Sequence, residues 1–323
     1  MCKVGVVGGT GYTAGELLRL LVNHPQLEID FVYSHSKPGE FVAEVHQDLL
    51  GTDLRFTDQV NENVEVLFLC LGHGNSAKFL SNHTFSSSTK IIDLSNDFRL
   101  NKDASFQGLD FQYGLVDVFK EEVKSAKHIA NPGCFATAIQ LALAPVAKAG
   151  LLNEQSIHIN AVTGSTGAGG GLSPTSHFSY RNNNLSVYKA FQHQHLGEIK
   201  ETIGKLANTD PEIHFLPVRG DFTRGIFASI YLNFSGKEEE ALAAFQAFYG
   251  NAPFVHLVPQ VHLKQVVNTN NVALSVEVID GKLLICCAID NLLKGAAGQA
   301  IENVNLMYNW PQNTGLNLKA NYF

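Results

Sequence analysis

The sequence predicts an α/β protein with two domains, a doubly wound and mostly parallel sheet followed by an α+β domain. Three observations carry this prediction. The chain has 323 residues, a length typical of about two domains. Apolar strand patterns alternate with helical patterns over residues 1–133, whereas Asp280-Gly281 in the later part joins two apolar runs as a hairpin would. We therefore place the first domain at residues 1–133 and the second at residues 134–290.

Composition excludes several classes of protein. Charged residues make up only 16% of the chain where about 25% is typical, and the net charge is −7. An acidic chain lacks the basic stripe that nucleic-acid binding requires, and no apolar run approaches the roughly 18 residues of a membrane span. The five cysteines are odd in number and show no metal-binding spacing. We expect reduced thiols, no bound metal, and a cytoplasmic protein without a signal peptide.

The chain opens with a strand at residues 3–7, a glycine-rich turn and a helix, and a second strand follows at residues 29–33. The turn, Gly8-Gly9-Thr10-Gly11-Tyr12-Thr13-Ala14-Gly15, is a stretched form of the G-x-G-x-x-G spacing. Its glycines let the backbone approach a pyrophosphate, whose charge then lies at the helix N-terminus. In this setting the turn predicts a Rossmann-like dinucleotide site, with contacts from Gly8, Thr10, Gly11, Tyr12 and Thr13.

The end of the second strand indicates which dinucleotide binds. An NAD site usually has Asp or Glu there, about 20 residues beyond the glycine turn. This chain has Ser34-His35-Ser36-Lys37 instead, and two hydroxyls and a cation suit a 2′-phosphate. We therefore expect NADP(H), with Ser34 and Ser36 among its contacts. Asp30, inside the strand, keeps an NAD site open as an alternative, and an ordinary polar loop is the other.

Two further strands, at residues 64–71 and 91–94, also end in polar turns. The first leads into Gly72-His73-Gly74 and a helix from about residue 77, and the second into Ser95-Asn96-Asp97-Phe98-Arg99. Ligands of open α/β sheets gather at the carboxyl ends of the strands. We expect Gly72 and His73 to contact the cofactor, although a Gly-His-Gly segment can be no more than a turn.

Cys134 has a different setting from the other cysteines. It follows Asn131-Pro132-Gly133 and directly precedes a strongly helical, apolar run at residues 136–144. At a helix N-terminus, unpaired N–H groups and the helix dipole stabilise a thiolate, so this cysteine has the setting of a nucleophile. Local chemistry alone leaves an inert capping cysteine open. Cys70, Cys286 and Cys287 lie in apolar runs and are expected to be buried.

Several motifs in order along the chain together resemble the N-acetyl-gamma-glutamyl-phosphate reductase family. They are Gly-Gly-Thr-Gly-Tyr-Thr-Ala-Gly-Glu-Leu (8–17), Asn-Pro-Gly-Cys (131–134), His-Gln-His-Leu-Gly-Glu-Ile (193–199) and Asn-Leu-Leu-Lys-Gly-Ala-Ala-Gly-Gln-Ala (291–300). Shorter segments at 71–74, 93–99, 113–115 and 224–226 add to these. Aspartate-semialdehyde dehydrogenase is a relative by fold.

The resemblance implies an NADPH-dependent reductase of arginine biosynthesis. Cys134 would attack an N-acyl-glutamyl 5-phosphate, release phosphate and form a thioester that NADPH reduces to the semialdehyde. His195 would be the base and acid, and Glu198 its orienting carboxylate. The spacing supports this pair independently, because residues three apart on a helix share a face. Two solvated helix histidines, His193 and His195, are the alternative interpretation.

The resemblance also implies the remaining contacts. Further cofactor contacts would be Gly164, Gly167 and Asn291, and the substrate would contact Arg99, Asn131 and Arg224. Arg181 and Arg219 are further arginines for the substrate's phosphate and carboxylate. The last helix, in residues 291–323, would return to the first domain, and the chain would form a homodimer or homotetramer.

One departure from the family leaves the acyl group open. Gly170-Gly171 stands where the family usually places a basic residue, so N-succinyl is an alternative to N-acetyl. Two other functions also remain open. One is a Cys-dependent semialdehyde dehydrogenase acting on another acyl phosphate, such as aspartyl phosphate. The other is an NADP-sensing regulator that needs neither Cys134 nor His195.

Overall fold

The computed structural model describes residues 1–152 and 156–323. The chain forms two compact units, unit 1 (Met1–Pro132 with Ala296–Asn317) and unit 2 (Gly133–Gly295 with Leu318–Phe323). Residues 133, 291–295 and 318–323 lie in unit 2, whereas the sequence predicts them in the first domain. Residues 291–295 belong to unit 2 because the carboxylate and carbonyl of Asp290 accept hydrogen bonds from this segment, which ties it to the end of the preceding strand.

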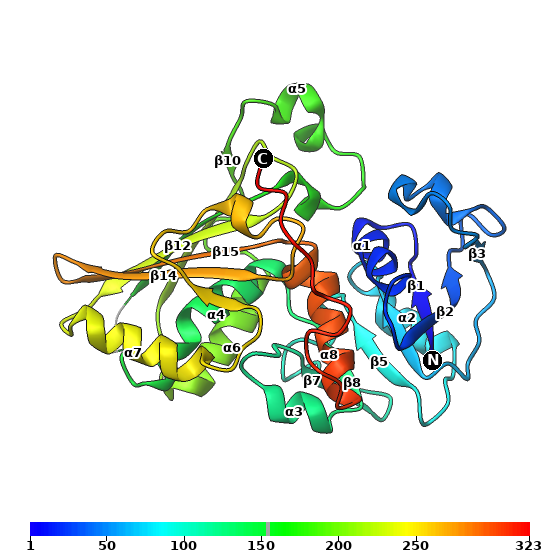
Figure 1. Ribbon diagram of the computed structural model, residues 1–323, viewed down its shortest axis with the longest axis horizontal. Coiled ribbons are helices and arrows are strands. Elements are labelled where there is room, and N and C mark those ends of the chain that lie inside the picture. The colour runs from blue at the N-terminus through cyan, green and yellow to red at the C-terminus, as the bar shows by residue number, and fades with distance from the viewer. Residues whose placement is uncertain (153–155) are drawn as a thin grey trace. The chain divides into compact units, whose positions relative to one another are not determined.

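Unit 1 contains an eight-stranded, mostly parallel sheet with the order β3-β2-β1-β4-β5-β8-β7-β6 (Figure 1). Only the β6–β7 pair is antiparallel among its described pairs. The strands are β1 (Cys2–Val7), β2 (Leu27–Tyr33), β3 (Phe56–Thr57), β4 (Val66–Leu69), β5 (Lys90–Asp93), β6 (Ser105–Phe106), β7 (Leu109–Tyr113) and β8 (His128–Ala130). The helices are α1 (Tyr12–Leu21), α2 (Asn75–Asn82), α3 (Lys120–Ser125) and α8 (Gly298–Met307). The predicted α/β class is confirmed.

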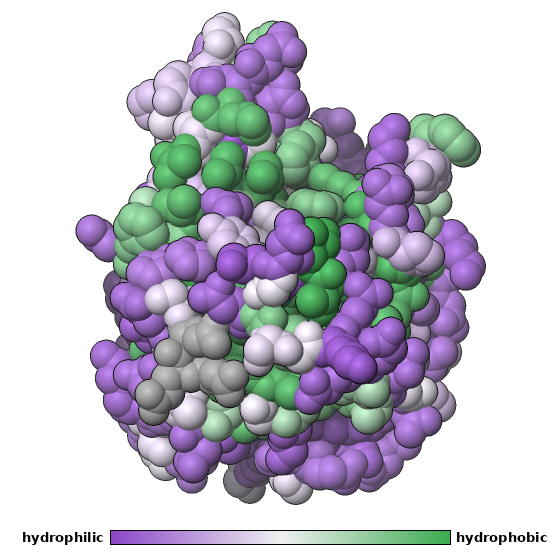
Figure 2. All heavy atoms as spheres, turned by 90° about the vertical axis from the view of Figure 1, so that its left-hand side faces the viewer, coloured by the Kyte–Doolittle hydropathy of each residue, from purple (hydrophilic) through white to green (hydrophobic). Residues whose placement is uncertain are grey.

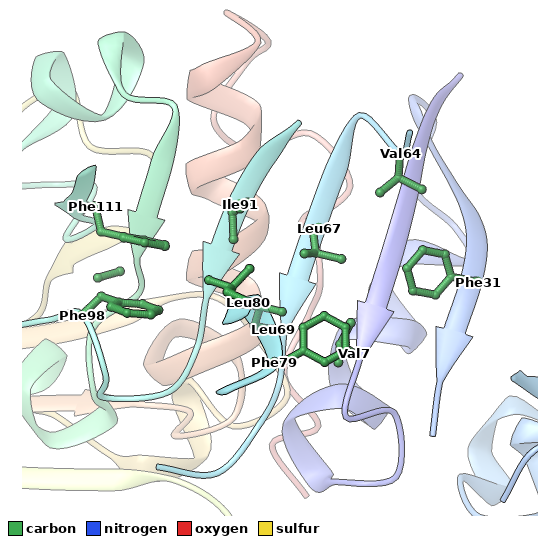
Figure 3. Packing of buried hydrophobic residues seen from close by; sticks show 11 residues of the cluster. Val7, Phe31, Val64, Leu67, Leu69, Phe79, Leu80, Ile91, Phe98 and Phe111 are labelled. Carbon is green, nitrogen blue, oxygen red and sulfur yellow. The ribbon is translucent and has the colours of Figure 1, made fainter. Parts of the chain in front are cut away.

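A hydrophobic cluster fills one face of this sheet, and α8 lies behind the other face (Figure 3). Successive strand residues point to opposite faces, so Leu67 and Leu69 enter this cluster while Phe68 between them is buried on the other side. α2 adds Phe79 and Leu80. Burial on both faces explains why β4 and residues 4–7 of β1 are continuous apolar runs rather than alternating ones. The rigid sheet holds the strand-end turns that bear the expected site residues.

Unit 2 contains a seven-stranded mixed sheet with the order β10-β11-β9-β12-β15-β14-β13. Its strands are β9 (Ile157–Thr163), β10 (Ser186–Val187), β11 (Ile213–Arg219), β12 (Ile226–Asn233), β13 (Val255–Leu257), β14 (Val272–Ile279) and β15 (Lys282–Ile289). Its helices are α4 (Cys134–Lys148), α5 (Phe178–Arg181), α6 (His195–Ala207), α7 (Glu238–Tyr249) and a π-helix (Leu293–Ala297) that continues into unit 1. The predicted hairpin joins β14 to β15, with positive φ at both Asp280 and Gly281 as a type I′ turn requires.

α4 is the central helix of unit 2. Every residue from Phe135 to Ala147 is buried, against β12, β15, α6 and α7. The same unit carries apolar side chains that remain exposed, among them Leu172, Phe178, Leu185, Val187 and Phe191. Figure 2 shows hydrophobic side chains, in green, gathered in the upper part of one face of the molecule. Apolar surface of this kind is typical of an interface with another chain.

Candidate active site

Cys134 is the first residue of α4, at the position that the sequence predicts. Gly133 before it is the N-cap, with extended backbone at φ −72° and ψ 151°, and it has no side chain to cap the helix. The apolar residues that follow anchor the helix in the core and leave its first turn to carry the thiol. Cys134 is half-buried. The thiol therefore lies at the N-terminal end of α4, where the helix dipole favours a thiolate, and it is not sealed into the core.

Glu198 connects the start of α4 with the start of α6. Its carboxylate is buried, and the Gly133 N–H donates to Oε2 at 2.9 Å. The other oxygen, Oε1, lies 4.0 Å from Nε2 of His195, the first residue of α6. The approach of Glu198 to His195 is expected from the sequence, but the hydrogen bond to Gly133 is not. One carboxylate thus fixes the backbone next to the thiol and places a negative charge beside the histidine.

Both histidines of the His-Gln-His motif are buried, so the interpretation as solvated helix residues is wrong. Nδ1 of His193 accepts a hydrogen bond from the His195 N–H at 3.2 Å, and the ring of Phe135 lies edge-on to both rings. Burial lowers the pKa of His193 to about 3, with repulsion from His195 and Lys189 adding to the effect. His193 therefore remains neutral at physiological pH and orients His195.

Tyr188 and Arg219 also belong to this site, and the sequence did not single them out as a pair. Burial raises the pKa of Tyr188 to about 12, and the negative charge of the Cys134 thiolate adds to it. The guanidinium of Arg219 lies 4.8 Å from the centre of the Tyr188 ring, and its buried Nε has no hydrogen-bond partner among the described residues. The pair forms because β10 aligns antiparallel with β11, and this register has no local sequence signal.

The loops that carry the other expected residues of unit 2 are tied together. The Asn291 side chain accepts a hydrogen bond from the Gly225 N–H and donates to Thr166 Oγ1, and the Gly164 N–H donates to the Gly225 carbonyl. Arg224, expected at the substrate, instead directs Nε and Nη2 at the Asp290 carboxylate, at 3.1 and 3.0 Å. Gly167 lies in the same group of loops, where an added Cβ would be 3.3 Å from the Thr163 hydroxyl.

In unit 1, the glycine-rich turn has the geometry that a phosphate-binding turn requires. Gly8 has φ +81°, and an added Cβ would lie 2.6 Å from the Cys70 carbonyl oxygen, so no other residue fits. Gly11 is the N-cap of α1 and makes no side-chain cap. Thr10 and Tyr12 are exposed and Thr13 is half-buried. The helix N-terminus is thus open to a ligand from outside the chain.

His46 also contacts this turn, and no local sequence pattern predicts the contact. Its Nε2 lies 2.7 Å from the Gly9 carbonyl oxygen, and its ring packs so closely on α1 that a Cβ at Gly15 would be 2.5 Å from Nδ1. Gly15 was expected to lie near the pyrophosphate. Its position instead serves the packing of α1 against His46.

The polar segment after β2 is arranged around its two serines. Ser34 Oγ and Ser36 Oγ lie 3.4 Å apart, and Ser34 is buried whereas Ser36 is exposed. Lys37 forms an ion pair with Glu40 at 2.6 Å. Arg55, a cation that the sequence analysis missed, donates to the Gly39 carbonyl of the same loop at 2.7 Å.

The turn after β4 meets the turn after β5. Nδ1 of His73 lies 3.1 Å from Asp97 Oδ1, and this carboxylate also accepts hydrogen bonds from the Gly74 and Ala77 N–H groups at the start of α2. The His73 side chain remains 76% exposed, and Gly72 before it is exposed as well. The Gly-His-Gly segment is therefore a helix-starting turn whose histidine faces solvent.

The two residues of unit 1 expected at the substrate contact each other. Arg99 donates from Nε to the Asn131 carbonyl at 2.8 Å and from Nη2 to the Leu94 carbonyl. The Asn131 side chain is buried, donates to the Ala296 carbonyl and accepts from Asn303. Both side chains thus have internal partners in unit 1.

The remaining four cysteines differ from Cys134. Burial raises the pKa of Cys2, Cys70, Cys286 and Cys287 above the ordinary value. Cys287 is buried as expected, whereas Cys70 and Cys286 are only partly buried by their residue exposure. All four are poor nucleophiles at neutral pH because the thiolate form is disfavoured.

Comparison with known proteins identifies the family. The family described as "Semialdehyde dehydrogenase, NAD binding domain" matches residues 3–126, and "Semialdehyde dehydrogenase, dimerisation domain" matches residues 134–291. Proteins named N-acetyl-gamma-glutamyl-phosphate reductase from Flavobacterium johnsoniae, Christiangramia forsetii and Bacteroides thetaiotaomicron are 55%, 52% and 50% identical, each over 100% of both chains. The chain belongs to the N-acetyl-gamma-glutamyl-phosphate reductase family. The resemblance stated from its motifs is confirmed.

Solved structures show the same fold at much lower identity. Aspartate semialdehyde dehydrogenase II complexed with ASA from Vibrio cholerae aligns with a TM-score of 0.74 at 15% identity, over 96% of this chain and 98% of that one. The enzyme with NADP from Candida albicans aligns with a TM-score of 0.69 at 15% identity, over 96% and 99%. Members of the reductase family are oxidoreductases, and the NAD-binding domain supports a nicotinamide cofactor. Among the described helices, none combines the length and apolar character needed to cross a membrane.

Proposed function

We propose that this protein reduces an N-acyl-L-glutamyl 5-phosphate to the N-acyl-L-glutamate 5-semialdehyde in arginine biosynthesis, with NADPH as reductant. The observation that carries the proposal is the junction of α4 and α6, where Glu198 binds the Gly133 N–H beside Cys134 and faces His195. A thiol at a helix N-terminus next to a buried histidine is suited to covalent catalysis on an acyl group. The names of the relatives supply the substrate class.

In the proposed mechanism, the Cys134 thiolate attacks the acyl carbon and the carbon–oxygen bond to phosphate breaks, which leaves a thioester on Cys134. When bound, NADPH supplies the hydride that reduces this thioester. The carbon–sulfur bond then breaks, and the aldehyde leaves as the thiolate reforms. His195 takes the thiol proton before attack and gives it to the oxygen of the thiohemiacetal. It takes this proton back as the carbon–sulfur bond breaks, and neutral His193 holds the His195 backbone throughout.

Substrate recognition requires cations, because the substrate carries a phosphate and a carboxylate. Arg219 supports this role, since it lies against Tyr188 near Cys134 and its buried Nε has no partner among the described residues. We propose Arg219 in unit 2 and Arg99 in unit 1 as anion-binding residues. N-acetyl is the acyl group in the relatives' names, and N-succinyl is the alternative that the assay compares.

Unit 1 would bind the cofactor, and its residues fit one. Only glycine fits at position 8, and the start of α1 is open to a pyrophosphate. Ser34, Ser36 and the nearby cations Lys37 and Arg55 would favour NADPH over NADH, which a comparison of the two KM values tests. The exposed apolar residues of unit 2, and the name of its matching family, support a homo-oligomer. The free cysteines support a location in the reducing cytoplasm.

The experiment measures the reverse reaction with NADP and phosphate. Its three substrates are N-acetyl-glutamate semialdehyde, N-succinyl-glutamate semialdehyde and aspartate semialdehyde. We expect turnover with an N-acyl-glutamate semialdehyde. In Cys134→Ser this turnover should fall at least about 1,000-fold, while NADPH binding is unchanged. Preference for aspartate semialdehyde would replace the proposed substrate. Turnover retained in Cys134→Ser would contradict the mechanism, and NADPH binding without turnover on any aldehyde would favour a sensor.

A further inference from the structure

Asp290, the residue after β15, carries a fully buried carboxylate with five hydrogen bonds. Oδ1 accepts from Arg224 Nη2 and from the N–H groups of Leu292 and Leu293, at 3.0, 2.8 and 3.1 Å. Oδ2 accepts from Arg224 Nε and from the Asn268 N–H, at 3.1 and 2.7 Å. The charge is thus matched by a bidentate guanidinium and three backbone amides, which is the arrangement that a buried carboxylate needs.

The turn that these bonds order, residues 290–295, ends against Cys134. The Gly295 N–H donates to the Asp290 carbonyl at 2.9 Å. A Cβ added at Gly295 would lie 2.8 Å from Cys134 Cβ and 3.2 Å from Cys134 Cα, so the Gly295 backbone packs directly on the nucleophile's own carbon atoms. Both residues belong to unit 2.

We propose that Asp290 is a positioning residue, which sets the placement of the Cys134 thiol through the 290–295 turn with Arg224 as its counterion. Direct contact of Asp290 with substrate is excluded by its complete burial, and its negative charge would repel an anionic acyl phosphate. In this role Arg224 acts through Asp290, whether or not it also contacts the substrate.

The position of the turn matters because covalent attack requires the sulfur within a narrow range of distance and angle to the acyl carbon. A shift of about 1 Å can lower the rate about 100-fold. Glu198 holds the preceding residue, Gly133, from the α6 side, and Gly295 supports Cys134 itself. The first turn of α4 is thus held from two directions by residues far apart in sequence. This inference rests on the proposed role of Cys134 as nucleophile.

The test compares Asp290→Asn and Gly295→Ala with a control in the same unit. Tyr249→Phe removes the hydrogen bond from the Tyr249 hydroxyl to the Leu141 carbonyl at 2.6 Å, in the middle of α4 and away from the thiol. For each variant we would measure kcat, the KM for NADPH, the melting temperature, and the rate of Cys134 alkylation by iodoacetamide from pH 5.5 to 9. Alkylation of the four other cysteines is suppressed by their raised pKa values.

We expect Asp290→Asn and Gly295→Ala each to lower kcat by about 10- to 100-fold, with the KM for NADPH within about twofold of wild type. Their alkylation profiles should change in rate or midpoint, and the double variant should lose less than the product of the single losses. Tyr249→Phe should lower the melting temperature alone. Wild-type kcat and alkylation in a destabilised Asp290→Asn would overturn the proposal.

Gly295→Ala leaves the groups that bind the Asp290 carboxylate unchanged. If Asp290→Asn does not fold, this variant therefore tests whether the 290–295 turn places the Cys134 thiol. Wild-type alkylation in Gly295→Ala would then overturn the proposal, and a slowed reaction would support it. Failure of the proposed function has a different signature. Cys134→Ser would then retain turnover, whatever Asp290→Asn does.

Discussion

Helices α1 and α4 each begin after a glycine with extended backbone, and the surroundings of these two helix starts differ. α1 begins after Gly11 and α4 after Gly133, each with extended backbone at the cap and no side-chain cap. A Cβ at Gly11 would meet only the Gly8 carbonyl oxygen, 3.9 Å away. At α4, by contrast, Glu198 takes the Gly133 N–H and Gly295 packs on Cys134.

The difference follows from where the negative charge comes from. An N-terminus that stabilises a phosphate of a ligand must leave room for it, and α1 is open in this way. The charge that α4 stabilises is on its own first residue, so the surrounding chain can close around it and fix its geometry. The same dipole therefore serves binding in unit 1 and reactivity in unit 2.

Glu198 gives the largest expected effect on this comparison. Glu198→Gln keeps an acceptor for the Gly133 N–H but removes the charge 4.0 Å from His195, and Glu198→Ala removes both. We expect kcat to fall about 10-fold in Glu198→Gln, because the general base His195 loses a nearby negative charge. We expect a fall of about 100-fold in Glu198→Ala, because Gly133 next to Cys134 also loses its hydrogen-bond acceptor. Steady-state kinetics at saturating substrate measure both.

The two Glu198 variants also separate the two contacts. If Glu198→Gln kept the wild-type kcat and Glu198→Ala lost most of it, the role of Glu198 would be its hydrogen bond to Gly133 alone. If kcat of both variants stayed within twofold of wild type, the contact of Glu198 with the start of α4 would not matter for activity. The contrast with α1 would then be wrong.

A pair of glycine variants tests the open start of α1. Gly11→Ala fits the structure, so it should leave the melting temperature unchanged but raise the Kd for NADPH about 10-fold by crowding the pyrophosphate. Gly15→Ala places a methyl group 2.5 Å from the His46 ring, whose other nitrogen bonds the Gly9 carbonyl. It should cost about 1–3 kcal/mol of stability and weaken NADPH binding only through the displaced turn.

Thermal unfolding and fluorescence titration with NADPH measure these two effects separately. A Gly11→Ala variant that binds NADPH as tightly as wild type would show that the pyrophosphate does not approach this glycine. An unchanged melting temperature in Gly15→Ala would show that His46 moves aside at no cost.

What the sequence predicts well is local. The strands β1, β2, β4 and β5 and the position of Cys134 at a helix start follow from hydrophobic period and from Pro-Gly punctuation. The missed contacts join residues far apart. Gly133 and Glu198 are 65 positions apart and Gly9 and His46 are 37 apart, and no local pattern encodes such pairs.

The role assigned to Arg224 shows the same limit from another direction. A family motif indicated that this arginine lies near the site, but a motif gives no partner for its guanidinium. The bidentate contact with Asp290 depends on the placement of β15 beside β12, which is a property of the assembled sheet. The functions of these residues remain predictions that the variants above test.

A third helix, α2, has carboxylates as hydrogen-bond acceptors at its start, and it can be compared with α1 and α4. Asp97 accepts the Gly74 and Ala77 N–H groups, and the Ser76 hydroxyl donates to buried Asp93 at 2.6 Å. Burial raises the pKa of Asp93 to about 6 from an ordinary 3.8, although hydrogen bonds from Ser76 and Ser95 oppose the shift. The hydrogen bonds of Asp93 come mainly from hydroxyls, and its raised pKa lets its protonation change near neutral pH.

The smallest expected effect is therefore a pH dependence of stability that Asp93→Asn removes. The folded chain holds the Asp93 proton more tightly than the unfolded chain, so this stabilisation is complete below the ordinary pKa and is lost as pH rises through about 6. Wild type should lose about 1 kcal/mol more than Asp93→Asn between pH 5 and pH 7. Urea unfolding at pH 5, 6 and 7 measures this difference, with kcat as the control that should not follow it. Parallel pH profiles would mean that Asp93 is ionised at all three pH values, and the raised pKa of Asp93 would be contradicted.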